Sequence, residues 1–144
     1  MLASNLHSFK CLTTIDLEGN AIEAAGALFL LSEPIELKTW ILRNCSIDRL
    51  SMVPNANRVF NEMKSQLEAQ ICRNPVLELI DIRDNIFSPS DFTEILTTLS
   101  LRTFDGCKIL PSEQNIDSQT FKALRGELKP EGKGAKGKKR KRGK

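Results

Sequence analysis

The sequence has few of the residues from which metal and catalytic sites are commonly built. It holds one histidine, His7, and its four cysteines, Cys11, Cys45, Cys72 and Cys107, show no C-x-x-C spacing. A structural zinc site needs several Cys or His ligands at characteristic spacings, so we expect no metal centre. Cysteines without such a pattern suit a reducing compartment, and we expect an intracellular protein.

Long apolar runs and a targeting segment are also lacking. No apolar stretch approaches the roughly 18 residues that cross a membrane, and the opening MLASNLHSFK lacks the charged start and apolar centre of a signal peptide. No glycine-rich phosphate loop occurs in the acidic part of the chain, and His7 has no Ser or Cys partner in a recognisable pattern. We therefore expect a soluble protein without cofactor or catalytic activity.

The formal net charge of +3 conceals two regions of opposite sign. Residues 129–144 carry nine Lys or Arg and one Glu, whereas residues 1–128 carry 12 basic and 17 acidic side chains. The basic segment consists mainly of Lys, Arg and Gly and has no large apolar side chain. Such a composition cannot bury enough surface to offset the entropy of ordering, so residues 129–144 are predicted to be a disordered tail.

An internal repeat runs through the acidic region. Its clearest copy is LELIDIRDNIF at 77–87, and the same frame occurs in LTTIDLEGNAI at 12–22 and LKTWILRNCSI at 37–47. A degraded copy, LRTFDGCKIL, begins at Leu101. Repetition of one short pattern at intervals of tens of residues indicates stacked repeat units. It predicts strands near 12–17, 37–42, 77–82 and 101–106.

The pattern resembles that of leucine-rich repeats, L-x-x-L-x-L-x-x-N/C-x-L, and Cys45 stands at the position where that pattern accepts Asn or Cys. The resemblance covers about residues 2–128. It implies an α/β solenoid of the ribonuclease-inhibitor-like class, with about four parallel strands on the concave side and helices on the convex side. It also implies a protein-binding scaffold, and it transfers no catalytic residue.

Helices are predicted between the strands. Apolar spacing favours helices over 22–31 and about 57–73, and Ser88-Pro89-Ser90-Asp91 has the residue types that begin a helix. A last helix over about 117–128 should close the stack, and Trp40 should lie in the core. The second and third copies begin 40 residues apart, which exceeds the family period of about 20–29 residues. The extra length lies in the segment 48–74, which is either an extended convex helix or an inserted contact element.

The phase of the repeat predicts which side chains face outward. Parallel stacking aligns Asp16, Ile41, Asp81 and Asp105 in one column. Neighbouring carboxylates repel each other unless a cation lies between or beside them. That cation could be Arg83, a basic group of a partner, or the basic tail folding back. The predicted partner-binding face comprises Asp16, Glu18, Ile41, Arg43, Asp81, Arg83 and Asp105.

The first predicted strand has no evident polar cap in front of it. An exposed strand edge invites pairing with another strand. We expect that the chain is a terminal piece of a longer repeat array, or that another molecule covers this edge.

The tail contains one basic block, which comprises Lys138, Lys139, Arg140, Lys141 and Arg142. Such blocks are read by nuclear import and attract polyanions, which slightly favours a nuclear over a cytoplasmic location. Without interleaved aromatic residues, any nucleic-acid contact would be to phosphates. Acidic protein surfaces fit equally well, and a merely solubilising end is a further alternative. Two functions stay open: a concave-face scaffold whose tail is a tether or nuclear address, and a polyanion-associated protein whose tail is the main binding element.

Overall fold

The computed structural model describes residues 11–49 and 54–127, in which strands and helices alternate. The elements are β1 (Thr14–Asp16), α2 (Glu23–Leu31), β2 (Thr39–Ile41), α3 (Ala56–Arg73), β3 (Leu79–Asp81), α4 (Pro89–Leu101), β4 (Lys108–Leu110) and α5 (Ser118–Leu124). All neighbouring strands are parallel, and their order in the sheet is β1-β2-β3-β4. The predicted α/β class is thus confirmed, whereas membership of the leucine-rich repeat family stays a prediction.

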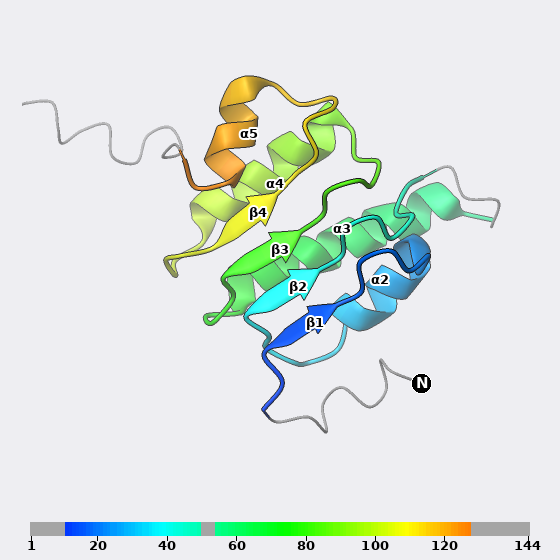
Figure 1. Cartoon of the computed structure of the whole chain (residues 1–144), viewed down its shortest axis with the longest axis horizontal. Helices are drawn as coiled ribbons and strands as arrows, with labels where there is room; N and C mark the ends of the chain where they lie inside the picture. The colour runs from blue at the N-terminus through cyan, green and yellow to red at the C-terminus, as the bar shows by residue number, and fades with distance from the viewer. Residues whose placement is uncertain (1–10, 50–53, 128–144) are drawn as a thin grey trace, which may run out of the picture.

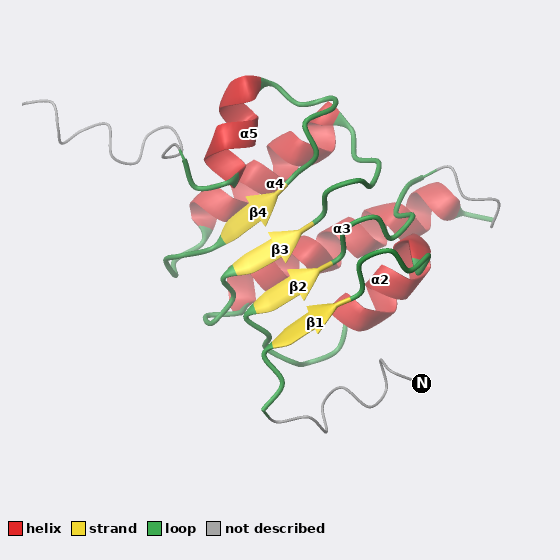
Figure 2. Ribbon diagram, viewed as in Figure 1, coloured by secondary structure: helices red, strands yellow, loops and turns green. Residues whose placement is uncertain are grey.

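The elements form two layers. Helices α2, α3 and α4 lie side by side on one face of the sheet, and the other face carries no described helix (Figures 1 and 2). Helix α5 packs against α4 and β4 at the far edge. Every strand is followed by a helix that returns the chain on the same side of the sheet. The first residues of all four strands therefore lie at one end of the sheet, and the last residues at the other.

The register repeats from strand to strand. Thr14 pairs with Thr39, Thr39 with Leu79, and Leu79 with Lys108. Backbone hydrogen bonds continue this register past the strand ends, from the Gly19 N–H to the Arg43 carbonyl at 3.1 Å, and from the Asn44 N–H to the Arg83 carbonyl at 2.9 Å. The first three predicted strands are therefore confirmed, in the predicted frame.

The predicted fourth strand, 101–106, is wrong. Helix α4 continues to Leu101, whose side chain is 71% exposed, and β4 begins at Lys108. The frame that aligns with β3 begins at Gly106 and reads GCKILPSEQNI. The error has a simple cause: the leucine that ends the amphipathic helix mimics the first leucine of another copy, while the true copy has Gly106 in place of that leucine.

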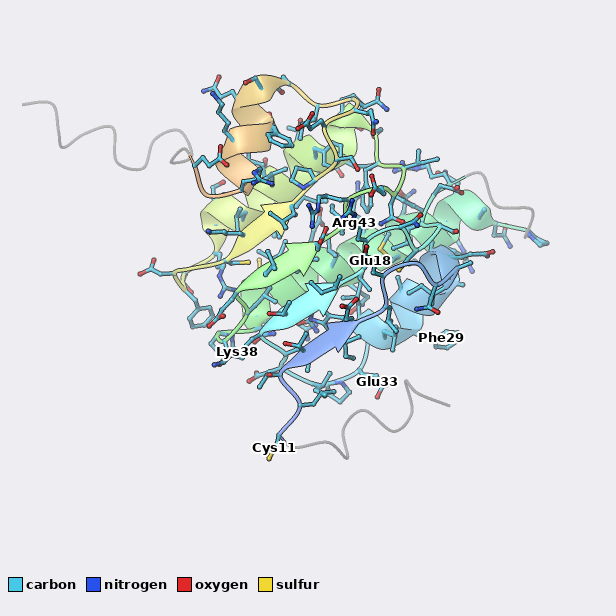
Figure 3. The ribbon with its side chains drawn as sticks, viewed as in Figure 1. Cys11, Glu18, Phe29, Glu33, Lys38 and Arg43 are labelled. Carbon is cyan, nitrogen blue, oxygen red and sulfur yellow. The ribbon has the colours of Figure 1, made fainter. Side chains whose placement is uncertain are left out.

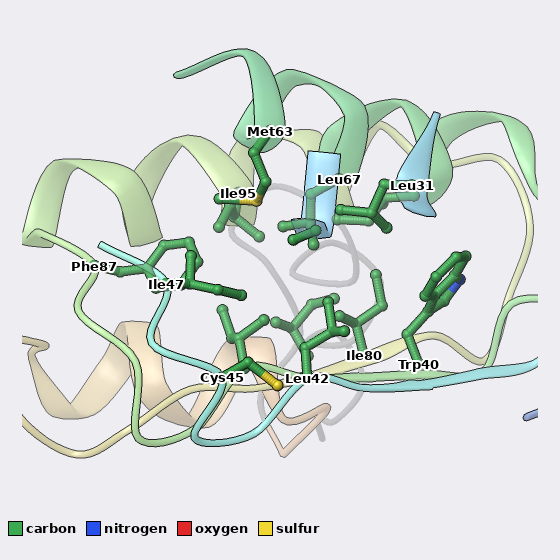
Figure 4. Close-up of a cluster of buried hydrophobic side chains, with 14 of the residues drawn as sticks. Leu31, Trp40, Leu42, Cys45, Ile47, Met63, Leu67, Ile80, Phe87 and Ile95 are labelled. Carbon is green, nitrogen blue, oxygen red and sulfur yellow. The ribbon is translucent and has the colours of Figure 1, made fainter. Parts of the chain in front are cut away.

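The core fills the space between the two layers. From the sheet, Trp40 and Ile80 point toward the helices and are fully buried. From the helix layer, Leu31, Met63 and Leu67 meet them, as Figure 4 shows. The prediction that Trp40 belongs to the core is confirmed.

The long segment before β3 belongs to the helix layer. Helix α3 packs on α2 on one side and on α4 on the other, which confirms the helix predicted over about 57–73. Its buried residues recur about every four positions and are Phe60, Met63, Lys64, Leu67, Gln70 and Ile71. The extra length thus supplies core and corresponds to the extended helix of the two alternatives.

A buried arginine caps this helix from a distance. Arg102 is only 8% exposed, and its guanidinium donates to the carbonyls of Ile71 at 2.6 Å, Asn74 at 2.9 Å and Leu77 at 3.0 Å. The last carbonyls of a helix have no partner within it, and a cation is favourable at that end. Arg102 therefore ties the C-terminus of α3 to the start of β3.

A buried ion cluster joins α3 to α4. The Asp91 carboxylate is 0% exposed and accepts hydrogen bonds from both terminal nitrogens of Arg49 at 2.7 Å and from Lys64 Nζ at 3.0 Å. Asp91 also forms a reciprocal pair with Ser88 that caps α4, as the sequence predicts for this helix start. Lys64 also bonds Glu94. Burial alone would raise the pKa of Asp91, but the hydrogen bonds from Arg49, Ser88 and Lys64 outweigh it and lower that pKa.

We expect Arg102→Ala to lower the free energy of unfolding by about 3 kcal/mol, because three buried carbonyls lose a charged donor. Urea denaturation of the full chain measures this change. Arg73→Ala removes an exposed arginine from the last turn of α3 and should cost less than about 0.5 kcal/mol. Equal costs for the two variants would contradict the capping role of Arg102.

The ion cluster predicts a pH dependence of stability. Folding lowers the pKa of Asp91, so the ionised carboxylate stabilises the folded state. This stabilisation is complete above the unfolded-state pKa of about 3.9 and is lost progressively as the pH falls below that value. Asp91→Asn should cost about 3 kcal/mol at neutral pH, since Arg49 and Lys64 lose their shared anion. Urea midpoints at pH 7 and pH 3 should differ less in this variant than in the wild type; an unchanged difference would show that other carboxyls dominate.

Candidate functional site: the open face of the sheet

The open face is the face of the sheet that lies opposite α2, α3 and α4. Alternate strand residues point to opposite faces, and the inward ones, Ile15, Trp40, Ile80 and Ile109, are buried. The open face therefore presents two rows across the strands. The first row is Thr14, Thr39, Leu79 and Lys108, and the second is Asp16, Ile41, Asp81 and Leu110.

Three aliphatic side chains occupy the middle of this face. Ile41, Leu79 and Leu110 lie on adjacent strands and are partly exposed. Leu79 and Leu110 line an open groove of about 700 Å³, together with residues at the starts of β2, β3 and β4. The polar residues around the groove include Lys38, Thr39, Glu78, Asp105 and Lys108. An apolar centre inside a charged rim is the composition of a contact surface.

The two aspartates of the second row have a local structural role. Asp16 Oδ1 accepts the N–H of Glu18 at 3.0 Å, and Asp81 Oδ1 accepts the N–H of Arg83 at 3.1 Å. Each carboxylate thus satisfies a backbone donor two residues on, where its strand ends. This recurrence explains why two copies of the repeat carry aspartate at the same position.

Arg83 supplies the cation for Asp81. Its Nε and Nη2 donate to the two oxygens of Asp81 at 3.0 and 2.7 Å, and Asp81 is only 2% exposed. The hydrogen bond to Asp81 raises the pKa of Arg83. Of the three origins considered for this cation, the structure shows the internal one. Asp81 is therefore covered rather than presented to a partner.

A second set of charges bridges the strand ends. Arg43 Nε donates to Asp84 Oδ2 at 2.8 Å, and Arg43 Nη1 lies 3.9 Å from Glu18 Oε2 (Figure 3). The hydrogen bond to Asp84 raises the pKa of Arg43. Glu18, Arg43 and Arg83 occupy matching positions after β1, β2 and β3, so the register alone brings this row together.

The prediction that Asp105 belongs to the aspartate column is wrong. Its place beside Asp81 is taken by Leu110, and Asp105 lies exposed in the loop before β4, at the rim of the groove. The displaced frame of the fourth copy causes the error. The same displacement hid Leu110 from sequence reasoning. Leu79 could have been found, because it is an apolar residue at an outward position of a well-predicted strand.

A ladder of side-chain hydrogen bonds holds the strand ends in register. Asn85 donates from Nδ2 to the Leu42 carbonyl at 2.7 Å, and its Oδ1 accepts the N–H groups of Cys45 and Ile47 at 3.0 Å each. Cys45, one repeat earlier, donates from Sγ to the Leu17 carbonyl at 3.1 Å. Cysteine thus replaces one of the bonds that asparagine makes. In the first copy, Asn20 donates from Nδ2 to the Leu17 carbonyl at 3.1 Å.

The turns after the strands need an unusual backbone. The matching positions Gly19, Asn44 and Asp84 have φ values of 82°, 55° and 60°. Gly, Asn and Asp are the residue types that adopt this left-handed conformation most readily. The sequence therefore encodes the same turn three times. The side chain that follows each turn bonds backbone at the end of its own strand or of the preceding one.

The basic block at 138–142 lies outside the described residues. Over residues 11–49 and 54–127, no group of three His, Cys, Asp or Glu side chains is arranged to hold a metal ion, and no helix is long and apolar enough to span a membrane. A comparison with protein-family models finds no model that matches this chain, and a comparison with curated protein sequences finds no match.

Asn85→Ala should lower the free energy of unfolding by about 3 kcal/mol, because two backbone N–H groups and one carbonyl lose their partner in a partly buried position. Cys45→Ala removes a weak thiol donor and a small apolar contact. The loss of the hydrogen bond should lower the free energy of unfolding by about 1 kcal/mol, in addition to the small effect of the lost contact. Chemical denaturation of both variants, with wild type as reference, tests the ladder. A smaller cost for the asparagine than for the cysteine would contradict it.

Proposed function

We propose that this protein is a non-catalytic scaffold that binds another protein on the open face of its sheet. The observation that carries the proposal is the patch of Ile41, Leu79 and Leu110, which we call the aliphatic patch. A solvent-facing sheet surface normally alternates to polar residues, yet these three half-exposed side chains sit together on adjacent strands. Clustered apolar side chains inside a polar rim resemble the centre of a protein interface.

The charges around the aliphatic patch support specificity. The pairs Asp81–Arg83 and Arg43–Asp84 are already satisfied within the chain, so they hold the strand ends rigid without needing a partner. Lys38, Glu78 and Lys108 are exposed at the other end of the strands and are free to complement a partner. Rim charges of this kind mainly steer association and exclude wrong partners.

The leucine-rich repeat interpretation gives the proposal its wider setting. It is supported by the constant register, by the repeated left-handed turns and by the hydrogen bonds of Asn85 and Cys45 at the N/C position. Proteins of this family use such a strand face to bind other proteins. The groove is open to solvent, and its carboxylates lack the enclosed, contrasting environments that acid–base catalysis requires.

The experiment uses the full chain as bait in extracts of its source cells, followed by titration with the purified captured protein. Leu79→Glu with Leu110→Glu places two charges on the aliphatic patch and should weaken binding at least about tenfold. The matched control is Phe29→Glu with Leu101→Glu, which adds the same two charges at apolar side chains that are 63% and 71% exposed on α2 and α4.

A second variant separates the scaffold from the alternative in which the tail is the main binding element. Changing Lys138, Lys139, Arg140, Lys141 and Arg142 to Gln leaves the open face intact. The scaffold proposal expects this variant to keep its partner. Loss of the partner in the tail variant, with retention in the Leu79/Leu110 variant, would instead assign binding to the tail.

A further inference from the structure

The segment that contains β1 and α2 is acidic and lacks basic residues. Residues 11–37 contain no Lys or Arg, and their five acidic residues form what we call the acidic end: Asp16, Glu18, Glu23, Glu33 and Glu36. All except Glu33 are exposed. Within the described residues, the only ion pair of the acidic end joins Glu18 to Arg43 at 3.9 Å. By contrast, Asp81, Asp84 and Asp91 each have an arginine within 2.8 Å.

The same end carries an edge strand. Within the described sheet, β1 pairs only with β2, to which Thr13 and Leu17 direct their backbone hydrogen bonds. Because alternate residues of a strand bond to opposite sides, the N–H and C=O groups of Thr14 and Asp16 face the outer edge. An edge of this kind can accept another extended segment.

Charge selects the occupant of this edge. A second copy that paired edge to edge would bring Asp16 and Glu18 against the same residues of its partner, and like charges across strands are destabilising. The edge also lacks the Lys and Pro residues that commonly block strand addition. A basic extended segment fits both the backbone and the carboxylates. The chain itself supplies one in residues 129–144.

We propose that the basic block Lys138–Arg142 docks on the outer edge of β1 in the same molecule, where it neutralises the acidic end. Four strand spacings of about 4.8 Å separate β4 from a segment docked on the outer edge of β1, or about 19 Å. From Glu127, beside α5, eleven residue steps of about 3.3 Å reach about 36 Å, so the tail spans this distance with slack. A short flexible connection gives the block an effective concentration in the millimolar range.

The docked tail has a functional consequence that goes beyond the scaffold proposal. A tail held on the acidic end is withheld from nucleic acid and from other polyanions. The acidic end therefore acts as an internal competitor, and any basic partner that covers β1 releases the tail. The aliphatic patch lies on the open face and takes no part, so the two proposals fail independently.

The direct test is nuclear magnetic resonance of the full chain. Amide shifts of the wild type are compared with those of the variant in which all five residues of the basic block are Gln. Differences should concentrate in residues 13–37 at low salt, disappear at about 0.5 M salt and not change on tenfold dilution. Absent differences, or differences centred on Asp81 and Arg83, overturn the proposal. Differences that fade on dilution place the tail on another molecule and overturn it as well.

A binding assay with oligothymidine checks the competition. Docking reduces the apparent affinity of the tail for oligothymidine by the fraction of time that the tail is free, which we take as about one fifth in the wild type. The triple variant Glu23→Gln, Glu33→Gln and Glu36→Gln frees the tail and should therefore tighten oligothymidine binding about fivefold. The matched control makes the same charge change elsewhere, at the exposed Glu62, Glu113 and Glu127. Equal tightening in both variants would mean a general charge effect and would contradict docking at the acidic end.

Discussion

The parallel register, repeated without a slip from β1 to β4, is the constraint on which the rest of the structure depends. It continues past the strands through backbone bonds and through the side-chain bonds of Asn85 and Cys45. A one-residue slip would exchange the buried and open faces of a strand. The buried row of Trp40 and Ile80, the aliphatic patch and the charge row after the strands all follow from this one alignment.

The polar groups buried in the molecule mostly connect its layers. Arg102 binds the end of α3 to the start of β3, and Asp91 joins Arg49 and Lys64 across two helices. Such groups are costly to bury unless they are fully bonded, so they favour one arrangement of the helices over others. The helix layer that results leaves the open face and the β1 edge without a covering element among the described residues, and our two proposals place binding there.

Sequence reasoning succeeded where local pattern and tertiary structure agree. The frames at 12–22, 37–47 and 77–87 each combine alternating apolar residues, a turn residue that tolerates a left-handed backbone and a polar residue for the turn. The helix at 56–73 and the Ser88 cap were equally readable. The fourth strand failed because Leu101 satisfies a helix and imitates a repeat at once, and this failure carried Asp105 into the wrong column and hid Leu110.

The sequence by itself determined the alternation of strands and helices, the burial of Trp40 and the separation of an acidic body from a basic tail, because these depend on periodicity and composition. Only the tertiary structure decided which carboxylates are already neutralised. Asp84 pairs with Arg43 and Asp91 with Arg49, and in each pair the arginine lies 41 or 42 residues earlier in the chain. Such pairs depend on which distant residues the register and the helix packing bring within hydrogen-bonding distance, and no local pattern contains them, whereas Arg83 pairs with Asp81 only two residues away.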